Sequence, residues 1–284
     1  MRKASALTRF VASGIAVAAL LGGCGQTPQA SPGSGVPSPA QAAAAGAYQA
    51  RGGDPIGLPP GSVYRNPASG RDEVVVPDMR HTALLIGDSQ SEPPDGWPRL
   101  GLAAVGYKVH FCGLGGTGFV ASNGKTGNYI DALQRGDWKL PYGTPALIVI
   151  QGGGNDAARG ATDAQIVANA DRLIDALKDR YPGARMAMIG TLARGANYGG
   201  GRRTQVDTLL GTVAARHGMP FVGVGDWLSK YNLAKNLADA VHMDAAGRRS
   251  LGGLLEARLR QLGLESPPLG VTVPVAASAP TPAD

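Results

Sequence analysis

Hydrophobic residues along the chain follow two alternating patterns. Five short, nearly continuous hydrophobic runs are typical of buried strands, and they cover residues 82–86, 107–112, 146–151, 185–191 and 220–224. Elsewhere hydrophobic residues recur every three or four positions, which predicts helices over residues 162–181, 204–217 and 244–262. Strands separated by helices favour a parallel sheet with right-handed crossovers. The pattern therefore predicts one α/β domain.

The two ends of the chain lack this pattern. Residues 1–23 combine basic residues with a hydrophobic run that is too short to span a bilayer, which is typical of a signal peptide. Residues 24–62 and 265–284 are rich in Pro, Ala, Gly and Ser, a composition that cannot bury enough surface to order a chain. We interpret these segments as a flexible tether and a disordered tail, which leaves residues 63–264 as the folded domain.

The end of the predicted signal peptide carries a further signal. Leu21-Gly22-Gly23 directly before Cys24 resembles a bacterial lipobox, in which the cysteine becomes the lipidated first residue of the mature protein. We therefore predict a protein outside the cytoplasm, anchored to the bacterial cell membrane or envelope through Cys24, since two or more acyl chains make a stable anchor. An ordinary signal peptide with an incidental cysteine is the alternative. The sequence does not indicate which membrane holds the anchor.

Charge and cysteine content narrow the possible partners. The chain has a formal net charge of +6, but residues 1–23 hold three basic residues and no acidic one, which leaves +3 for the remainder. No dense Lys/Arg run with interleaved aromatic residues occurs, so nucleic acid is not an expected partner. With Cys24 lipidated, Cys112 has no disulfide partner within the chain, and we expect it to be a small buried residue. We also expect a monomer.

Gly87-Asp88-Ser89 follows the first predicted strand, at the carboxyl end where parallel α/β sheets bind ligands. A serine on a rigid strand end, beside a glycine that lets the backbone turn, is well placed as a nucleophile. The same three residues are also common in turns. The interpretation therefore depends on whether the chain supplies a base, a group that orients the base, and donors for an oxyanion.

Glycine-rich segments follow the next two predicted strands. Residues 113–118 fit the pattern G-x-G-x-x-G, but they follow the second strand, and no later strand supplies the acidic residue of a dinucleotide site. Residues 124–126 are one position out of register for a phosphate loop. We interpret residues 113–118 as a turn with exposed backbone N–H groups. Asn155 offers a side-chain amide at the same sheet edge, although Asn155 and Asp156 are also typical turn residues.

A general base in such a site must be histidine or a group with a similar pKa. His242, alone among the four histidines, lies between two carboxylates, Asp239 and Asp244. Asp244 is a typical N-cap for the last helix, so Asp239 is left to orient the imidazole. The other histidines have structural explanations. A metal site is the competing interpretation of this Asp/His cluster.

These motifs resemble those of the SGNH (GDSL-type) hydrolase superfamily and occur in the same order over residues 82–262. The resemblance implies a flavodoxin-like three-layer α/β/α sandwich with a five-stranded parallel sheet. It also implies serine esterase chemistry without a metal or any other cofactor. Carried over by position, it makes Ser89 the nucleophile, His242 the base and Asp239 the residue that orients the base.

The resemblance implies an oxyanion hole as well. Its donors would be the backbone N–H of Ser89, a backbone N–H of the glycine turn and the side chain of Asn155. Within the turn we favour Gly116, because it precedes a small polar residue as the family glycine usually does, and Gly115 is the alternative. Gln90 departs from the longer G-D-S-[LY] pattern, which leaves the subfamily open. No G-x-S-x-G motif occurs, which disfavours the α/β-hydrolase fold.

The predicted function is hydrolysis of acyl esters, short-chain ones such as O-acetyl esters, on cell-envelope or extracellular substrates. An acyltransferase would use the same residues and pass the acyl group to a sugar hydroxyl. A metal-dependent phosphoesterase would recruit Asp88, Asn155, Asp156 and His242 but lacks further ligands in the sequence. A catalytically silent envelope-binding module is the third alternative. Residues 193–203, with three arginines, are expected to shape the pocket.

Overall fold

The computed structural model describes residues 50–51 and 57–268. The predicted signal peptide, the predicted lipidation site Cys24, and most of the predicted tether and tail lie outside the described residues. Within the described part of the chain, no helix has both the length and the hydrophobicity that a membrane crossing requires.

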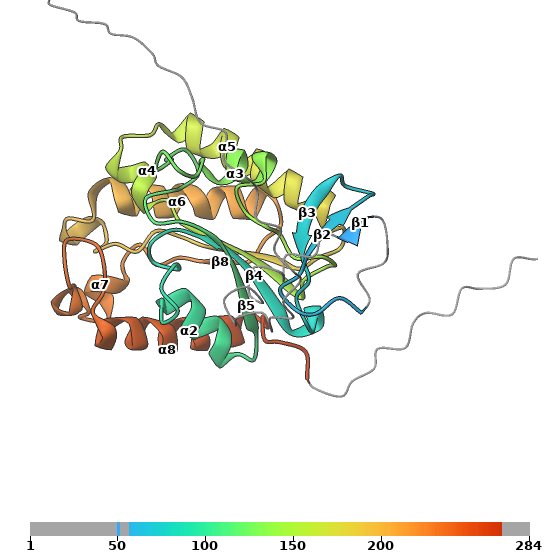
Figure 1. Cartoon of the computed structure of the whole chain (residues 1–284). Helices are drawn as coiled ribbons and strands as arrows, with labels where there is room; N and C mark the ends of the chain where they lie inside the picture. The colour runs from blue at the N-terminus through green and yellow to red at the C-terminus, as the bar shows by residue number, and fades with distance from the viewer. Residues whose placement is uncertain (1–49, 52–56, 269–284) are drawn as a thin grey trace, which may run out of the picture. The chain divides into compact units, whose positions relative to one another are not determined.

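Five parallel strands form the central sheet, in the order β5-β4-β6-β7-β8 (Figure 1). Their bounds are Thr82–Gly87 (β4), Lys108–Gly113 (β5), Leu147–Gln151 (β6), Met186–Ile189 (β7) and Phe221–Val222 (β8). All six residues of β4 are buried, as expected for a strand covered on both faces. β8 is shorter than the predicted strand 220–224, because within that range only Phe221 and Val222 pair with β7. The sheet confirms the predicted fold class.

Helices cover both faces of this sheet (Figure 1). One face carries α2 (Trp97–Ala104) and α8 (Ala245–Gln261), and the other carries α3 (Tyr129–Arg135), α5 (Asp163–Arg180) and α6 (Gly201–Arg216). Successive side chains of a strand point to opposite faces. Accordingly, Leu84 and Ile86 of β4 pack with α3, α5 and α6, whereas Ala83 and Leu85 pack with α2 and α8. This is the predicted three-layer sandwich.

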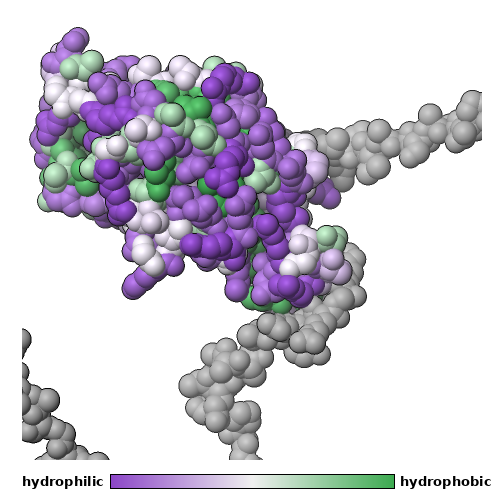
Figure 2. Space-filling view, turned by 90° about the horizontal axis from the view of Figure 1, so that it is seen from above, coloured by the Kyte–Doolittle hydropathy of each residue, from purple (hydrophilic) through white to green (hydrophobic). Residues whose placement is uncertain are grey.

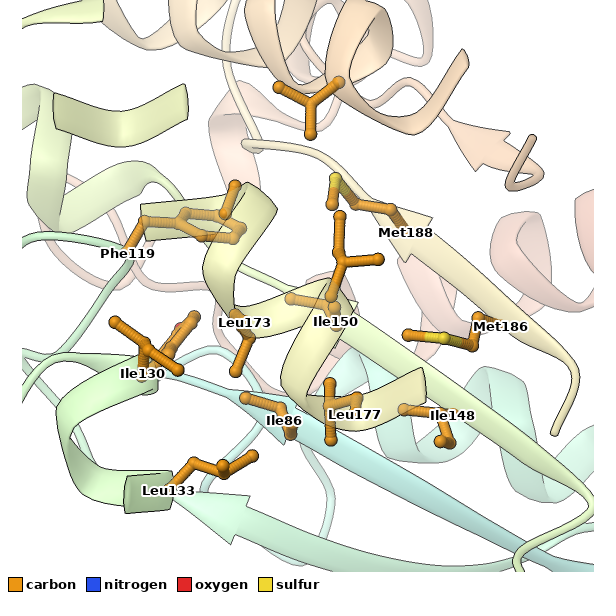
Figure 3. Close-up of a cluster of buried hydrophobic side chains, with 14 of the residues drawn as sticks. Ile86, Phe119, Ile130, Leu133, Ile148, Ile150, Leu173, Leu177, Met186 and Met188 are labelled. Atoms are coloured by element: carbon orange, nitrogen blue, oxygen red, sulfur yellow. The ribbon is translucent and has the colours of Figure 1, made fainter. Parts of the chain in front are cut away.

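The core between the sheet and α5 is shown in Figure 3. Strand residues Ile86, Ile148 and Ile150 gather there with Leu173 and Leu177 of α5, and all five are fully buried. On the outside of this layer, hydrophilic residues cover most of the surface, and hydrophobic residues show in small separate groups (Figure 2). The helices are thus amphipathic, as their sequence periodicity predicts.

Two predicted helix starts are confirmed and one is displaced. Thr162 caps α5, accepting a hydrogen bond from the N–H of Gln165 over 3.3 Å, and Asp244 caps α8. α6 begins at Gly201, three residues before the predicted start at Thr204. Thr204 therefore lies inside the first turn of α6, and its hydroxyl donates to the backbone carbonyl of Gly225 over 3.0 Å.

Glycines lie where α2 and α8 meet. A Cβ atom on Gly101 of α2 would lie 2.6 Å from the Leu255 side chain of α8, and one on Gly252 of α8 would lie 2.8 Å from Cβ of Leu100. Side chains do not tolerate such distances, so the absence of a side chain at these two positions allows the close approach of the helices. α2 follows the loop that carries Ser89, and α8 follows the loop that carries His242.

A second, smaller sheet is not predicted by the hydrophobic pattern. β2 (Val63–Asn66) and β3 (Arg71–Val74) pair antiparallel, and β1 (Ala50–Arg51), within the segment interpreted as a tether, pairs with β2. Tyr64 packs edge-to-face on Tyr142 with ring centroids 5.3 Å apart, which attaches the hairpin to the domain. Short strands rich in charged residues give little hydrophobic signal, which explains why they are missed.

Shorter elements complete the described chain. They are α4 (Gly154–Ala158), α7 (Trp227–Lys230), and the 3-10 turns η1 (Met79–His81), η2 (Ala196–Tyr198) and η3 (Ala234–Asn236). α4 directly follows β6, and η3 leads into the loop before α8. Both matter for function, because they carry or precede predicted site residues.

Candidate active site

The sheet places the predicted site residues at one edge. Ser89 follows the carboxyl end of β4, and Asn155 lies in α4 just after the carboxyl end of β6, which is the neighbour of β4. Asp239 and His242 lie on the loop between η3 and α8. Since parallel strands end at the same side of a sheet, residues far apart in sequence meet there.

A continuous hydrogen-bonded chain joins Ser89, His242 and Asp239. Oγ of Ser89 lies 2.8 Å from Nε2 of His242, and Nδ1 of His242 lies 2.8 Å from Oδ2 of Asp239. If Nδ1–H donates to the carboxylate, Nε2 is left to accept the serine proton. The side chains of His242 and Asp239 are 41% and 55% exposed, so water has access to the base.

The backbone around Asp239 keeps its carboxylate ionised. The N–H groups of His242 and Val241 each donate to Oδ1 of Asp239 over 2.7 Å. These two bonds, followed by the bond from the His242 ring, hold the pKa of Asp239 well below its usual range. The three-residue spacing of Asp239 and His242 therefore produces a tight turn. In this turn the backbone N–H of His242 holds the Asp239 carboxylate, and the same carboxylate orients the His242 ring.

Gln90 connects the loop of Ser89 to the loop of His242. Its Nε2 donates to the carbonyl of Val241 over 2.9 Å, and its Oε1 accepts a hydrogen bond from Nε1 of Trp97 over 3.1 Å. Gln90 is buried, so these bonds are shielded from water. The side chain thus holds the residue before His242 next to the residue after Ser89. In the sequence, Gln90 is visible only as a departure from the pattern G-D-S-[LY].

The two candidate glycines of the oxyanion hole differ in position. A Cβ atom on Gly115 would lie 3.4 Å from Cβ of Ser89, whereas one on Gly116 would lie 3.4 Å from Cβ of Asn123. Gly116 has a φ of +79°, so its role is to turn the backbone. A side chain at Gly115, but not one at Gly116, would therefore contact Ser89.

The side chains of Asn155 and Glu92 both form hydrogen bonds with the backbone of the glycine turn. Nδ2 of Asn155 donates to the carbonyl of Thr117 over 2.8 Å, which orients the amide and leaves its second hydrogen for another acceptor. The N–H of Gly115 donates to Oε2 of Glu92 over 2.8 Å. The Glu92 carboxylate therefore occupies the N–H of Gly115, a contact that no sequence motif indicates.

Asp156 has a structural role in this turn. Its carboxylate is fully buried and accepts hydrogen bonds from the N–H groups of Phe119, Val120 and Ala121 over 3.0, 2.7 and 2.8 Å. A side chain on Gly118 would overlap this carboxylate, so glycine permits the contact. In the described part of the chain, no group of three or more His, Cys, Asp or Glu residues is placed to hold a metal ion.

The remaining histidines and the described cysteine have structural surroundings. His81 and His217 each lie within 2.8 Å of an aspartate oxygen, and Nε2 of His110 lies 3.1 Å from a backbone carbonyl. Cys112 is buried, as predicted, and burial raises the pKa of its thiol to about 12. None of these four side chains is therefore needed to explain the hydrogen bonds that link Ser89, His242 and Asp239.

A small recess lies beside the nucleophile. Its volume is about 20 Å³, and its lining residues are Asp88, Ser89, Gln90, Gly154, Asn155, Arg203 and Val241. Arg203 comes from the segment 193–203 that was predicted to shape the pocket, and its Nε donates to the carbonyl of Leu192 over 3.0 Å. The recess has room for a small chemical group only.

Asp88 lies fully buried beneath this recess. Burial raises the pKa of its carboxyl from 3.8 to about 6, although the N–H of Gln90 and the charge of Arg203 act in the opposite direction. Because the folded-state pKa lies above the unfolded value, Asp88 favours the folded state at low pH. This contribution is full below about pH 4 and is lost as the pH rises through about 6.

We expect the Asp88→Asn substitution to remove this pH dependence, since an amide does not ionise. Between about pH 4 and about pH 7, the unfolding free energy of the variant relative to wild type should rise on the order of 2 kcal/mol. Urea unfolding of both proteins across this range measures the difference. Asp179→Asn, at an exposed position, is the control and should show a constant offset. A constant offset for Asp88→Asn would contradict the assignment.

Residues 83–249 match the family model described as GDSL-like lipase/acylhydrolase. The chain belongs to this family. The matched range extends from β4 into α8 and contains Ser89, Asn155, Asp239 and His242. Membership in the GDSL-like family agrees with the observed sheet order and confirms the resemblance to SGNH hydrolases.

Proteins similar to this GDSL-like chain include esterases. A multidomain esterase from Ruminococcus flavefaciens is 28% identical over 134 residues. These residues are 45% of this chain and 17% of the esterase, so the chain spans about a sixth of the length of that esterase. An active-site mutant of a family two carbohydrate esterase from Clostridium thermocellum is 15% identical, with a TM-score of 0.50 over 68% of each chain. A family two carbohydrate esterase from Cellvibrio japonicus is 15% identical, with a TM-score of 0.50 over 64% of this chain and 61% of that one. The two structures support the fold.

Proposed function

We propose that the protein is a serine esterase that hydrolyses short-chain acyl esters. The observation that carries this proposal is the hydrogen-bonded chain from Ser89 through His242 to Asp239, with the amide of Asn155 at the same sheet edge. Nucleophile, base, orienting carboxylate and oxyanion donor are the components that acyl transfer through a serine requires. Membership in the lipase/acylhydrolase family supports the same chemistry.

In the proposed reaction, Nε2 of His242 accepts the hydroxyl proton of Ser89 while Oγ attacks the ester carbonyl carbon. The carbonyl oxygen becomes an oxyanion, stabilised by the N–H of Ser89, a backbone N–H of the glycine turn and the amide of Asn155. His242 then protonates the leaving alcohol, and water attacks the acyl-enzyme by the same route to release the acid and restore the serine.

The size of the recess beside Ser89 supports a short acyl group. A volume of about 20 Å³ is close to that of one water molecule, which suits the methyl group of an acetyl ester. For the alcohol part, we propose a carbohydrate of the cell envelope or its surroundings. The names of the similar proteins, which include carbohydrate esterases, and the predicted lipid anchor at Cys24 support this part of the proposal.

Two measurements test the proposed activity. With p-nitrophenyl acetate, butyrate and octanoate, we expect kcat/KM to fall as the acyl chain lengthens. Incubation with a fluorophosphonate should add one adduct to the intact mass, located on Ser89. A folded protein that forms no adduct and hydrolyses none of the three esters would contradict esterase activity and favour a binding module.

The Asn155→Ala substitution is expected to lower kcat for p-nitrophenyl acetate about 100-fold to 1,000-fold, because it removes one oxyanion donor. KM should change little, since the donor acts on charge that develops in the transition state. Asn169→Ala is a matched control: Nδ2 of Asn169 also donates to a backbone carbonyl, that of Phe119, over 2.8 Å. Equal kcat values in the two variants would exclude Asn155 from the oxyanion hole.

A further inference from the structure

A cavity of about 280 Å³ lies between the hairpin and the helical layer of the domain. β3, the C-terminal end of α3 with the segment after it, and the last residue of α5 contribute to its walls (Figure 1). None of the residues that line it belongs to the recess beside Ser89. Its volume is near the lower end of the range for small-molecule sites, so it fits a ligand of about the size of one sugar.

The walls of this cavity carry an excess of positive charge. Its five cationic lining residues are Arg65, Arg71, Arg135, Lys139 and Arg180, and its two acidic ones are Asp72 and Glu73. Three of the cations have carboxylate partners. Arg65 pairs with Asp72 over 3.2 Å, Arg135 pairs with Asp137 over 2.6 Å, and Arg180 pairs with Glu73.

Arg71 and Lys139 are left without a carboxylate. Among the described residues, no ion pair involves either side chain, although Nη1 of Arg71 donates to the carbonyl of Leu133 over 3.0 Å. Arg71 has further donors besides Nη1, since a guanidinium carries five N–H groups. Two positive charges in the wall of one concave site therefore remain uncompensated.

The same wall contains buried donors with no acceptor. Nε1 of Trp138 and Nε of Arg180 are buried, and neither has a hydrogen-bond partner in the part of the chain that the structure describes. Trp138 is 8% exposed, and its ring packs near Tyr129 with ring centroids 6.0 Å apart, so the indole is held in place. Both nitrogen atoms are shielded from solvent, so an anion in the cavity would contact Arg71 and Lys139 rather than these donors.

We propose that this cavity binds the oxyanion group of a small ligand, a carboxylate, sulfate or phosphate carried by a compound of about the size of a sugar. Arg71 and Lys139 would supply the positive charge. Guanidinium and ammonium groups form charge-assisted hydrogen bonds with such oxyanions. The proposal rests on this cavity alone and is independent of the chemistry at Ser89.

Isothermal titration of the full protein at constant ionic strength tests this site. The probes are galacturonate, glucose 6-phosphate, inorganic phosphate and, as the uncharged control, glucose. We expect saturable binding of at least one anion with one site per chain, and weaker or no binding of glucose. Tightest binding of galacturonate would identify a carboxylate ligand. Tightest binding of glucose 6-phosphate would identify a sugar phosphate. Equal affinity for glucose 6-phosphate and inorganic phosphate would identify free phosphate.

Variants decide whether the anion binds in this cavity. Arg71→Gln and Lys139→Gln should each weaken binding about tenfold or more. Lys230→Gln, at an exposed lysine on α7 outside the cavity, is the matched control and should bind as wild type does. Lys139→Gln alters an exposed side chain, so it keeps the test valid if Arg71→Gln fails to fold.

Three results would overturn the proposal. They are the absence of saturable binding for all three anions, equal affinity for glucose, and an equal loss of affinity in Lys230→Gln, which would indicate general attraction of anions to a basic protein. Hydrolysis of p-nitrophenyl acetate should be unchanged in Lys139→Gln. Failure of the anion site would therefore leave the proposed esterase activity intact.

Discussion

Replacing Ser89 with alanine is expected to lower kcat for p-nitrophenyl acetate by about 10⁴-fold or more, because it removes the oxygen that attacks the ester. The variant should also fail to form the fluorophosphonate adduct. Its unfolding midpoint should remain near that of wild type, since the hydroxyl makes its hydrogen bond with His242 at the partly exposed site. Adding His242→Ala should lower kcat little further, because the two residues act as a unit.

Ser91, two residues further along, provides a matched control for this prediction. Its Oγ is buried and donates to Oε1 of Gln151 over 2.6 Å. Ser91→Ala should therefore lower stability while kcat stays within a few-fold of wild type, which is the reverse of the pattern for Ser89→Ala. Turnover by Ser89→Ala near the wild-type rate would exclude Ser89 as the nucleophile.

The Asp156→Ala substitution is expected to lower the free energy of unfolding by about 3–5 kcal/mol, because three buried backbone N–H groups lose their acceptor. For a domain of this size, the unfolding midpoint should fall by roughly 10 °C. The three N–H groups directly follow the glycine turn of residues 113–118, which contains Gly115, so kcat should fall as well. Urea unfolding and ester hydrolysis measured on the same preparation test both effects.

Asp163→Ala is the control for the loss of a carboxylate. Asp163 pairs with Arg202 over 2.6 Å at the surface, and its side chain is 62% exposed. An exposed ion pair contributes about 1 kcal/mol or less, so this variant should be nearly as stable as wild type. If Asp156→Ala is equally stable, the glycine turn does not depend on the Asp156 carboxylate.

Features that depend on neighbouring residues can be predicted from this sequence. The central strands are hydrophobic runs, and Thr162 and Asp244 cap helices by accepting from N–H groups three residues later. The turn that joins Asp239 to His242 is equally local, and its hydrogen bonds span two or three residues. Short-range backbone geometry sets all of these contacts.

Contacts between distant segments cannot be predicted in the same way. Gln90 and Val241 are 151 positions apart, and Glu92 meets Gly115 across 23 positions. The choice between Gly115 and Gly116 also depends on how two loops approach each other, because both glycines fit the motif. Thr204 likewise donates its hydroxyl to the carbonyl of Gly225, 21 positions later, a contact that the helical pattern does not indicate.

The close contact of α2 and α8 bears on the distance between Ser89 and His242. Each of the two residues lies just before one of these helices, and the helices meet through Gly101 and Gly252. The distance between Oγ of Ser89 and Nε2 of His242, over which the proton would pass, therefore depends on how closely α2 and α8 pack at Gly101 and Gly252. A larger residue at either glycine would push the two helices apart and with them the two loops.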